Sequence, residues 1–217
     1  MVSILITAGP TREYLDDVRF LSNGSSGRMG FALAEAALAA GCTATLVLGP
    51  VELAPPAGAK VVPVVSALAM REAAAAAFAT SDILIAAAAV ADWRPAERAV
   101  GKPARGAEPP VLRLVANPDI VAELAARKGR RVVVGFALES VAAGLPAAIA
   151  RGRAKLVRKQ LDLCVVNLHD TIGAADVELV LCHADGRDLP LRKCDKSVAA
   201  TRIVAAAMDL WRTRQAS

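Results

Sequence analysis

A loop of small residues, Ser22-Asn23-Gly24-Ser25-Ser26-Gly27-Arg28-Met29-Gly30, leads directly into a helix-forming run that begins at Phe31. Its three glycines recur at every third position, so the backbone can turn sharply and approach a ligand closely. Exposed N–H groups and the positive end of the following helix would then face an anion. A Gly/Ser turn that only starts a helix would look the same, because a glycine loop alone is a weak motif.

Strand-like and helix-like segments alternate on both sides of this loop. Apolar runs bounded by turn residues predict buried strands at 2–7, 42–48, 60–64, 82–89, 131–136 and 161–166. Helix-forming runs predict helices at 27–40, 67–79, 117–128 and 140–159. This alternation indicates an α/β fold that is Rossmann-like, a mostly parallel sheet with helices on both faces.

The last 41 residues, counted from Val177 to Ser217, depart from this alternation. An Asp-Gly pair between the apolar runs 177–183 and 188–192 predicts a hairpin, hence a small antiparallel C-terminal appendage. A final helix is predicted at 197–214, and its inward face is expected to carry Val198, Ile203 or Val204, Met208 and Trp211.

Composition predicts one globular domain spanning 1–217. The chain is 55% hydrophobic and 22% charged, which is ample for a buried core, and no linker cleanly divides it. The proline-rich segment 93–112 breaks the pattern and is expected to be a flexible flap. No apolar run is long enough to span a membrane, and the N-terminus lacks a basic leader, so we expect a cytoplasmic protein. The four scattered cysteines favour buried free thiols over disulfides or zinc ligands.

Three functional classes are compatible with these features. A formal charge of +5 allows a nucleic-acid-binding adaptor, but with only 3% aromatic residues a small polyanionic ligand fits as well. A nicotinamide-dependent reductase normally has an acid at the end of its second strand. Here that strand ends in Gly49-Pro50. A Tyr-x-x-x-Lys catalytic pair is also impossible, because the only tyrosine is Tyr14 and the residue four positions later is Val18. No Walker-type Gly-Lys-Ser/Thr follows the glycines.

Several stretches, taken in order, resemble phosphopantothenate–cysteine ligase of the bacterial CTP-dependent type. They are Ile6-Thr7-Ala8-Gly9-Pro10-Thr11-Arg12-Glu13, Val18-Arg19-Phe20-Leu21 with the glycine loop, Ala87-Ala88-Ala89-Val90-Ala91-Asp92-Trp93-Arg94, Asn117-Pro118-Asp119-Ile120-Val121 and Val134-Gly135-Phe136-Ala137. The resemblance covers nearly the whole chain. In many bacteria the ligase is fused behind a flavin-dependent decarboxylase domain; we expect a stand-alone ligase here, or an excised half.

The resemblance implies a two-step reaction of coenzyme A biosynthesis. The carboxylate of 4′-phosphopantothenate attacks the α-phosphate of CTP and releases pyrophosphate, and the amine of L-cysteine then displaces CMP from the acyl-cytidylate. Mg²⁺ is required and is expected to be held mainly by the triphosphate and water, with no dedicated protein metal site. The family also implies a homodimer of these subunits, with no nucleic-acid or membrane partner.

The resemblance further assigns the site residues. Asn23 and Lys102 are the implied catalytic residues. The implied nucleotide-binding residues are Ala86, Ala87, Ala88, Asp92, Lys102, Pro118, Asp119, Ile120, Val121, Phe136, Lys155 and Lys159. The implied substrate-binding residues are Arg19, Asn23, Gly24, Ser25, Ser26 and Gly27. The family's flap pattern Lys-x-Lys-Lys is Lys102-Pro103-Ala104-Arg105 here, so Arg105 is at best a partial substitute for the later lysines.

Ordinary roles also fit several of these residues. Arg19 is equally compatible with a solvated surface position, and Asp119 with a simple helix cap. Lys155 and Lys159 lie four residues apart, hence on one helix face, where a run of charge is usually solvated.

Overall fold

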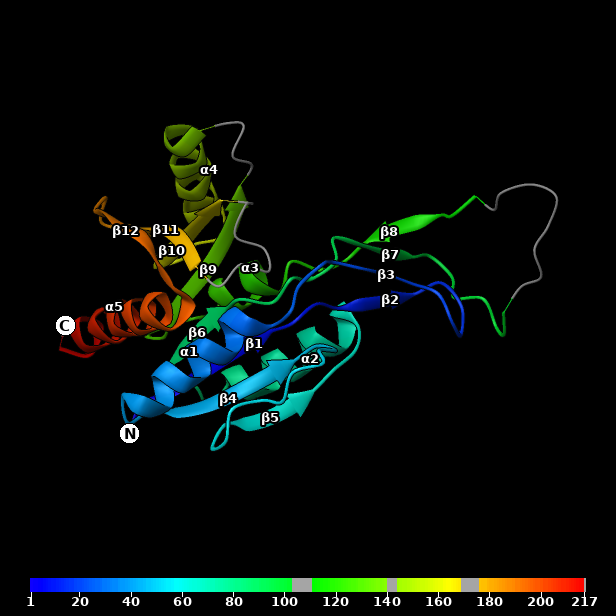
Figure 1. Cartoon of the computed structure of the whole chain (residues 1–217), viewed down its shortest axis with the longest axis horizontal. Coiled ribbons are helices and arrows are strands. Elements are labelled where there is room, and N and C mark those ends of the chain that lie inside the picture. Colours follow the sequence, from blue (N-terminus) through cyan, green and yellow to red (C-terminus); the bar gives the residue numbers. More distant parts are fainter. Residues whose placement is uncertain (103–110, 140–143, 169–175, 217) are drawn as a thin grey trace.

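The structure, a computed structural model, describes residues 1–102, 111–139, 144–168 and 176–216. Within them the chain forms an eight-stranded sheet in the order β12-β11-β10-β9-β6-β1-β4-β5 (Figure 1). Its strands are β1 (Ser3–Ala8), β4 (Thr43–Leu48), β5 (Lys60–Pro63), β6 (Ile83–Ala86), β9 (Val132–Glu139), β10 (Leu163–Leu168), β11 (Asp176–His183) and β12 (Asp188–Asp195). All neighbours from β10 to β5 pair in parallel, which confirms the predicted Rossmann-like fold.

Helices cover both faces of this sheet. The helices α1 (Arg28–Ala39) and α5 (Lys196–Ala216) pack on one face, and α2 (Ala67–Phe78), α3 (Ile120–Ala125) and α4 (Gly144–Arg158) pack on the other. Successive side chains of a strand point to opposite faces. In β1, Ile4 and Ile6 accordingly join the core layer under α1 and α5, while Leu5 joins the layer under α2 and α4.

The C-terminal hairpin is present and is continuous with the main sheet. The strand β11 pairs antiparallel with β10, so the hairpin extends the parallel sheet at its edge. On α5 the inward face is formed by Ala199, Ala200, Ile203, Val204, Ala207 and Met208. Val198 was predicted to face inward but is 48% exposed, because it precedes the buried stripe by one position.

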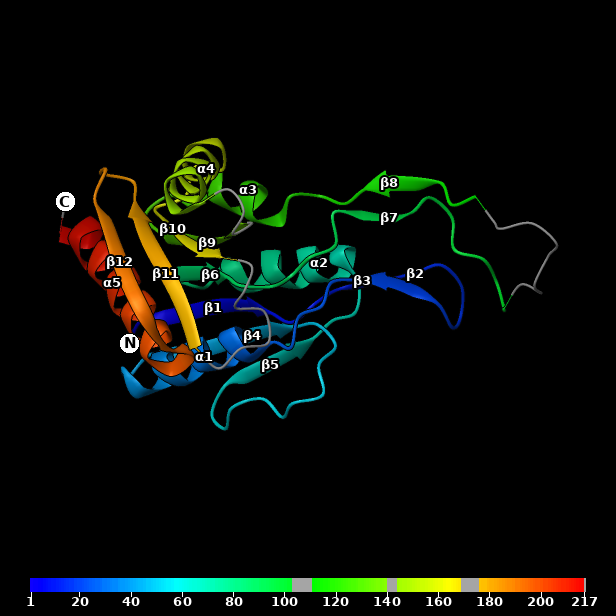
Figure 2. The ribbon, with the colours of Figure 1, turned by 45° about the horizontal axis from the view of Figure 1, so that its top comes forward.

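Two short antiparallel ladders project from the sheet and form an arm, which we define as residues 11–22, 93–102 and 111–116. They pair β2 (Arg12–Tyr14) with β3 (Phe20–Ser22), and β7 (Trp93–Pro95) with β8 (Leu114–Ala116). Both views show the arm extending away from the helices and the sheet (Figures 1 and 2). The sequence did not predict these strands, because three residues of mixed polarity carry no readable period. The tip of the expected flap, 103–110, and Arg105 with it, lies outside the described residues.

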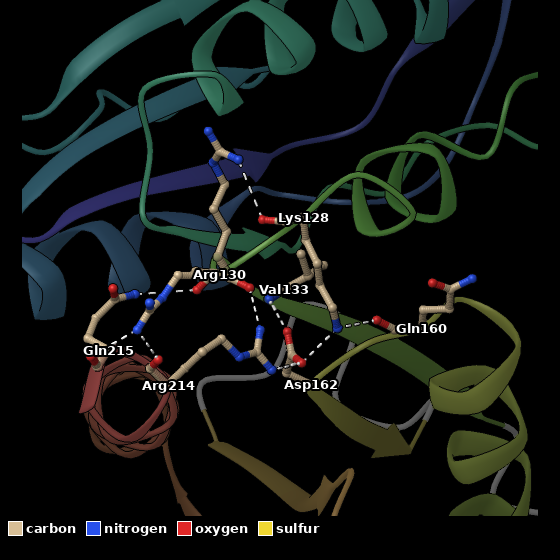
Figure 3. Close-up of polar contacts among 8 residues, drawn as sticks. Lys128, Arg130, Val133, Gln160, Asp162, Arg214 and Gln215 are labelled. Atoms are coloured by element: carbon tan, nitrogen blue, oxygen red, sulfur yellow. Dashed lines mark hydrogen bonds and ion pairs between the residues drawn. The ribbon is translucent and has the colours of Figure 1, made fainter. Parts of the chain in front are cut away.

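The amino-terminal edge of the sheet is tied together by the buried carboxylate of Asp162 (Figure 3). This carboxylate accepts hydrogen bonds from Lys128 Nζ at 2.7 Å, from Arg214 Nη2 at 2.6 Å and from the Val133 N–H at 2.8 Å. Arg130 donates to the last carbonyl groups of α5, those of Arg214 and Gln215. The network therefore fixes the C-terminal helix to the start of β9 and β10, at the edge opposite the glycine loop.

None of the four cysteines forms a disulfide; Cys42, Cys164 and Cys182 are buried, whereas Cys194 is partly exposed. Among the described residues, no helix is both long enough and apolar enough to cross a membrane.

Candidate active site at the carboxyl edge of the sheet

The glycine loop meets the sheet where β1 ends. Gly27 caps α1 with a left-handed backbone (φ 75°), a conformation that favours glycine. One turn later, a Cβ on Gly30 would lie 2.3 Å from the Cβ of Ala8, so α1 can approach β1 only because this residue is glycine. Gly24 and Ser26 are exposed, and the Gly27 N–H donates to Ser25 Oγ at 3.4 Å. The start of α1 is thus held directly above the end of a central parallel strand.

Asn23 joins this loop to the segment that follows β6. Its Nδ2 donates to the carbonyl oxygens of Ala89 and Val90, at 3.2 and 3.1 Å. The same segment is also held by Thr11, because the Ala91 N–H donates to Thr11 Oγ1 at 3.0 Å. One amide side chain therefore joins the glycine loop to the segment after β6. Its two acceptors, Ala89 and Val90, lie 66 and 67 residues further along the chain.

Asp92 continues from that segment and meets the start of α3. The Asn117 N–H donates to the Asp92 carbonyl, and Asn117 Nδ2 donates to the Ala91 carbonyl, both at 2.8 Å. Arg94 Nη1 donates to Asn117 Oδ1 at 3.1 Å and so fixes that side chain from the arm. The Asp92 carboxylate remains exposed at the surface of this junction. In the sequence, Asn117 and Arg94 belong to family-like stretches without an assigned site role, because their contacts depend on the fold.

Asp119 caps α3. A helix cap is one of the two roles that the sequence allows for this residue, and nucleotide binding is the other. Its Oδ1 accepts from the Ala122 N–H at 3.1 Å, and its carboxylate pairs with Lys159 Nζ at 2.8 Å. Partial burial raises the pKa of Asp119, but the hydrogen bonds from Lys159 and Ala122 outweigh burial and hold that pKa below its usual value. The carboxylate is therefore ionised at neutral pH.

Lys155 on α4 and Lys159, which directly follows that helix, lie at this same junction. Lys155 Nζ donates to the Phe136 carbonyl at 2.6 Å, while Lys159 is only 15% exposed in its ion pair with Asp119. Burial and the neighbouring Lys159 charge lower the pKa of Lys155. A polyanion arriving here would relieve that unfavourable charge, so the lysine pair is suited to bind phosphate oxygens.

Four of the apolar residues predicted for the nucleotide belong to the core layer under α2 and α3, whereas Ala87 and Phe136 pack against the layer under α1 and α5. Ala86, Ala88, Ile120 and Val121 line a cavity of about 20 Å³, which is the size of one water. They form the floor of the site and pack α3 against the sheet. Among the described residues, no three His, Cys, Asp or Glu side chains gather where they could hold a metal ion.

Arg19 and Lys102 lie apart from the other predicted site residues. Both belong to the outer end of the arm, where the turn between β2 and β3 contacts the segment that follows β7 (Figure 1). The four residue steps of extended chain from Asn23 to Arg19 correspond to about 13 Å. Arg19 is bound to Asp16 by an ion pair of 2.6 Å, and Lys102 is exposed. The structure therefore brings Asn23, Asp92, Asp119, Lys155 and Lys159 together, but not these two cations.

Comparison with known proteins identifies the fold and the family. The model of the family described as DNA/pantothenate metabolism flavoprotein C-terminal domain matches residues 1–210. A coenzyme A biosynthesis bifunctional protein CoaBC from Vibrio cholerae serotype O1 is 43% identical over 206 residues, which cover 91% of this chain and 50% of that protein. The protein of the same name from Bacillus subtilis is 42% identical over 211 residues, covering 94% of this chain and 51% of that one.

A solved structure agrees with these relatives. The crystal structure of the C-terminal domain of a CoaBC protein superimposes with a TM-score of 0.81 and 34% identity, covering 96% of this chain and 95% of that chain. This chain spans about half the length of the curated relatives that it matches. The resemblance found in the motifs is confirmed: the chain belongs to the family of the DNA/pantothenate metabolism flavoprotein C-terminal domain.

Proposed function

We propose that this chain joins 4′-phosphopantothenate to L-cysteine in coenzyme A biosynthesis, with CTP as the activating nucleotide. The observation that carries this proposal is the convergence, at one edge of the sheet, of the glycine loop, the Asp92 segment, the start of α3 and the pair Lys155 and Lys159. In open α/β sheets this carboxyl edge is where ligands bind. The relatives named CoaBC support the pathway, and the motifs support the nucleotide.

In the first step, the phosphopantothenate carboxylate attacks the α-phosphate of CTP and pyrophosphate leaves. The glycine loop would hold the phosphate of phosphopantothenate with the N–H groups at the start of α1, a twelve-residue helix. Lys155 and Lys159 would bind the triphosphate, for which Lys159 exchanges Asp119 for a phosphate oxygen. Lys102 would follow the negative charge as pyrophosphate departs, and Asp92 would bind the cytidine part.

In the second step, the cysteine amine attacks the acyl carbon and loses a proton as the amide forms; the acyl C–O bond breaks, and CMP leaves with one former carboxylate oxygen on its phosphate. Asn23 would donate from Nδ2 to the oxyanion that forms on the acyl oxygen. In the structure Nδ2 donates to the carbonyls of Ala89 and Val90. One of these bonds is exchanged for the oxyanion, and the other keeps the amide in place.

Mg²⁺ would reach this site with the nucleotide. The donor chemistry fits that arrangement, because Mg²⁺ prefers six oxygen ligands and the described residues offer single carboxylates here, such as the exposed Asp92. When bound, Mg²⁺ would neutralise charge on the phosphates and hold them for in-line attack.

The arm supports a homodimer. Among the described residues, seven large apolar side chains on it are exposed at 39% or more: Val18, Phe20, Trp93, Val100, Val111, Leu112 and Leu114. Exposed apolar patches of this kind mark protein interfaces, and isolated two-stranded ladders have little stability of their own. We propose that the arms of two copies pair, which would bring the outer-end cations Arg19 and Lys102 to a second copy.

A nucleotide-dependence assay tests this function. We expect pyrophosphate release that requires CTP, Mg²⁺ and 4′-phosphopantothenate together, and ligation only after L-cysteine is added. Lys102→Gln should slow acyl-cytidylate formation, whereas Asn23→Asp should let that intermediate accumulate. No pyrophosphate release with all three components present would refute the proposal, and normal turnover in both variants would refute the two catalytic roles.

A further inference from the structure

The turn between β2 and β3, residues 15–19, holds the backbone just before Lys102. Asp17 Oδ2 accepts a hydrogen bond from the Gly101 N–H at 2.9 Å, and the Asp17 N–H donates to the Gly101 carbonyl at 3.3 Å. Two residues earlier, the Ala99 N–H donates to the Leu15 carbonyl at 2.8 Å. The turn therefore binds this segment through its backbone at two points, and Lys102 is the next residue along the chain.

The charge of Asp17 is balanced within the same contact. Its Oδ1 accepts from Arg98 Nη2 at 2.9 Å, and the Arg98 guanidinium also lies over the ring of Tyr14, 5.1 Å from the ring centre. Asp17 thus has a cationic partner of its own and does not draw on the ammonium of Lys102. What it fixes is the position of the backbone from which Lys102 extends.

The same turn also fixes the other cation of the outer end. Asp16, which is buried, accepts from the N–H groups of Arg19 and Val18 and binds the Arg19 guanidinium. Hydrogen bonds from those backbone N–H groups, with the Arg19 guanidinium, lower the pKa of Asp16 to about 2. Two adjacent acids in one turn therefore hold Arg19 and the backbone just before Lys102.

We propose that Asp17 is a positioning residue that holds Lys102, through Gly101, for the activation step. This proposal rests on the proposed function, in which Lys102 acts on the departing pyrophosphate. Lysine is long and flexible, and a displacement of about 1 Å in a catalytic group can cost about a hundredfold in rate. Releasing Gly101 would enlarge the volume that the ammonium samples while leaving nucleotide binding at the carboxyl edge intact.

The test compares Asp17→Ala with two related variants. Asp17→Asn keeps an oxygen that can accept from the Gly101 N–H, although it loses the charge that pairs with Arg98. Glu97→Ala removes the same charge from an exposed residue of the same segment, for which the described residues show no hydrogen bond or ion pair. Hydrogen exchange at the amides of Ala99 and Gly101 is measured for each protein, together with kcat and KM for CTP in pyrophosphate release.

We expect Asp17→Ala to speed exchange at Gly101 by at least tenfold and to lower kcat about tenfold, with KM for CTP changed less than twofold. Asp17→Asn should recover most of both losses, and Glu97→Ala should behave as the native protein. In a Lys102→Gln background, Asp17→Ala should cause no further loss of kcat, because Asp17 acts through that lysine.

Three results would overturn the proposal. Unchanged exchange at Gly101 in Asp17→Ala would show that the carboxylate does not hold the backbone. Faster exchange with an unchanged kcat, or a full further loss in the Lys102→Gln background, would show that holding Gly101 does not position Lys102. A native protein that releases no pyrophosphate would instead refute the proposed function, and this proposal with it, before any variant is made.

Discussion

Single side chains at the carboxyl edge already bind partners within the protein. Lys159 pairs with Asp119, Lys155 donates to the Phe136 carbonyl, and Asn23 donates to two carbonyls. A bound triphosphate or acyl oxyanion would replace these internal partners as the acceptor. Until then, the internal partners keep the donor groups oriented. Such preorganisation removes part of the cost of arranging donors around developing charge.

Gly30 gives a direct test of how the glycine loop is placed. A Cβ there would lie 2.3 Å from the Ala8 Cβ and 3.3 Å from its Cα, and both are fixed by a central strand. We expect Gly30→Ala to lower the free energy of unfolding by about 2 kcal/mol, as overpacked core sites do. Urea unfolding followed by circular dichroism would measure it.

Gly24 is the matched control for that substitution. A Cβ on Gly24 would meet nothing within 4 Å, so Gly24→Ala should change the free energy of unfolding by less than about 0.5 kcal/mol. Equal stability losses in the two variants would contradict the close approach of α1 to β1.

Among the elements, α5 depends on the ion network at the opposite edge (Figure 3). Asp162→Asn would remove the charge that binds Lys128 and Arg214 while keeping an oxygen for the Val133 N–H. Because the carboxylate and Lys128 are mostly buried, we expect a loss of about 3 kcal/mol in the free energy of unfolding. The end of α5 should also exchange its amide hydrogens faster.

The exposed pair of Asp209 with Arg212 on the same helix provides the comparison. Asp209→Asn should cost about 0.5 kcal/mol or less, since exposed ion pairs contribute little. If Asp162→Asn cost no more than Asp209→Asn, the network would not be what fixes α5.

Elements with a strong period were predictable from the sequence, and short elements were not. Each central strand is a buried apolar run, and α1 follows from the glycine loop and ends before Gly41, so their order could be inferred. The arm was missed because its strands are three residues long, and they are held by contacts such as that between Asp17 and Gly101. Val198 was misplaced because helix spacing alone leaves the rotation of α5 uncertain by one residue.

The candidate site was predictable as a set of motifs but not as a geometry. The resemblance supplies the residues of the glycine loop, Asp92, Asp119, Lys155 and Lys159. The fold then brings them to one edge of the sheet. The separate position of Arg19 and Lys102 could not be inferred, because it depends on the length and direction of the arm. Residues that only hold others, such as Asp16, Asp17 and Arg94, belong to no motif that spacing reveals.

At the scale of the whole molecule, the exposed apolar surface of the arm is the feature on which the proposed dimer rests. Trp93 is 56% exposed and Val111 is 98% exposed on it. We expect the native protein to sediment as a dimer and Trp93→Asp to shift it to monomer, because a charge would be buried without a partner at the interface. Val198→Asp, at an exposed position of α5, should leave the dimer unchanged. A monomeric native protein would contradict pairing through the arm.

Binding of CTP with Mg²⁺, measured by calorimetry, tests most directly whether the carboxyl edge holds the nucleotide. Lys159→Gln just after α4 and Asp92→Asn after β6 should each raise the Kd at least tenfold, since a hydrogen bond to a charged group contributes about 1.5–3 kcal/mol. Lys60→Gln, on the exposed edge strand β5, should leave the Kd unchanged. The opposite result, an unchanged Kd in both site variants with the fold intact, would show that these residues do not surround one nucleotide.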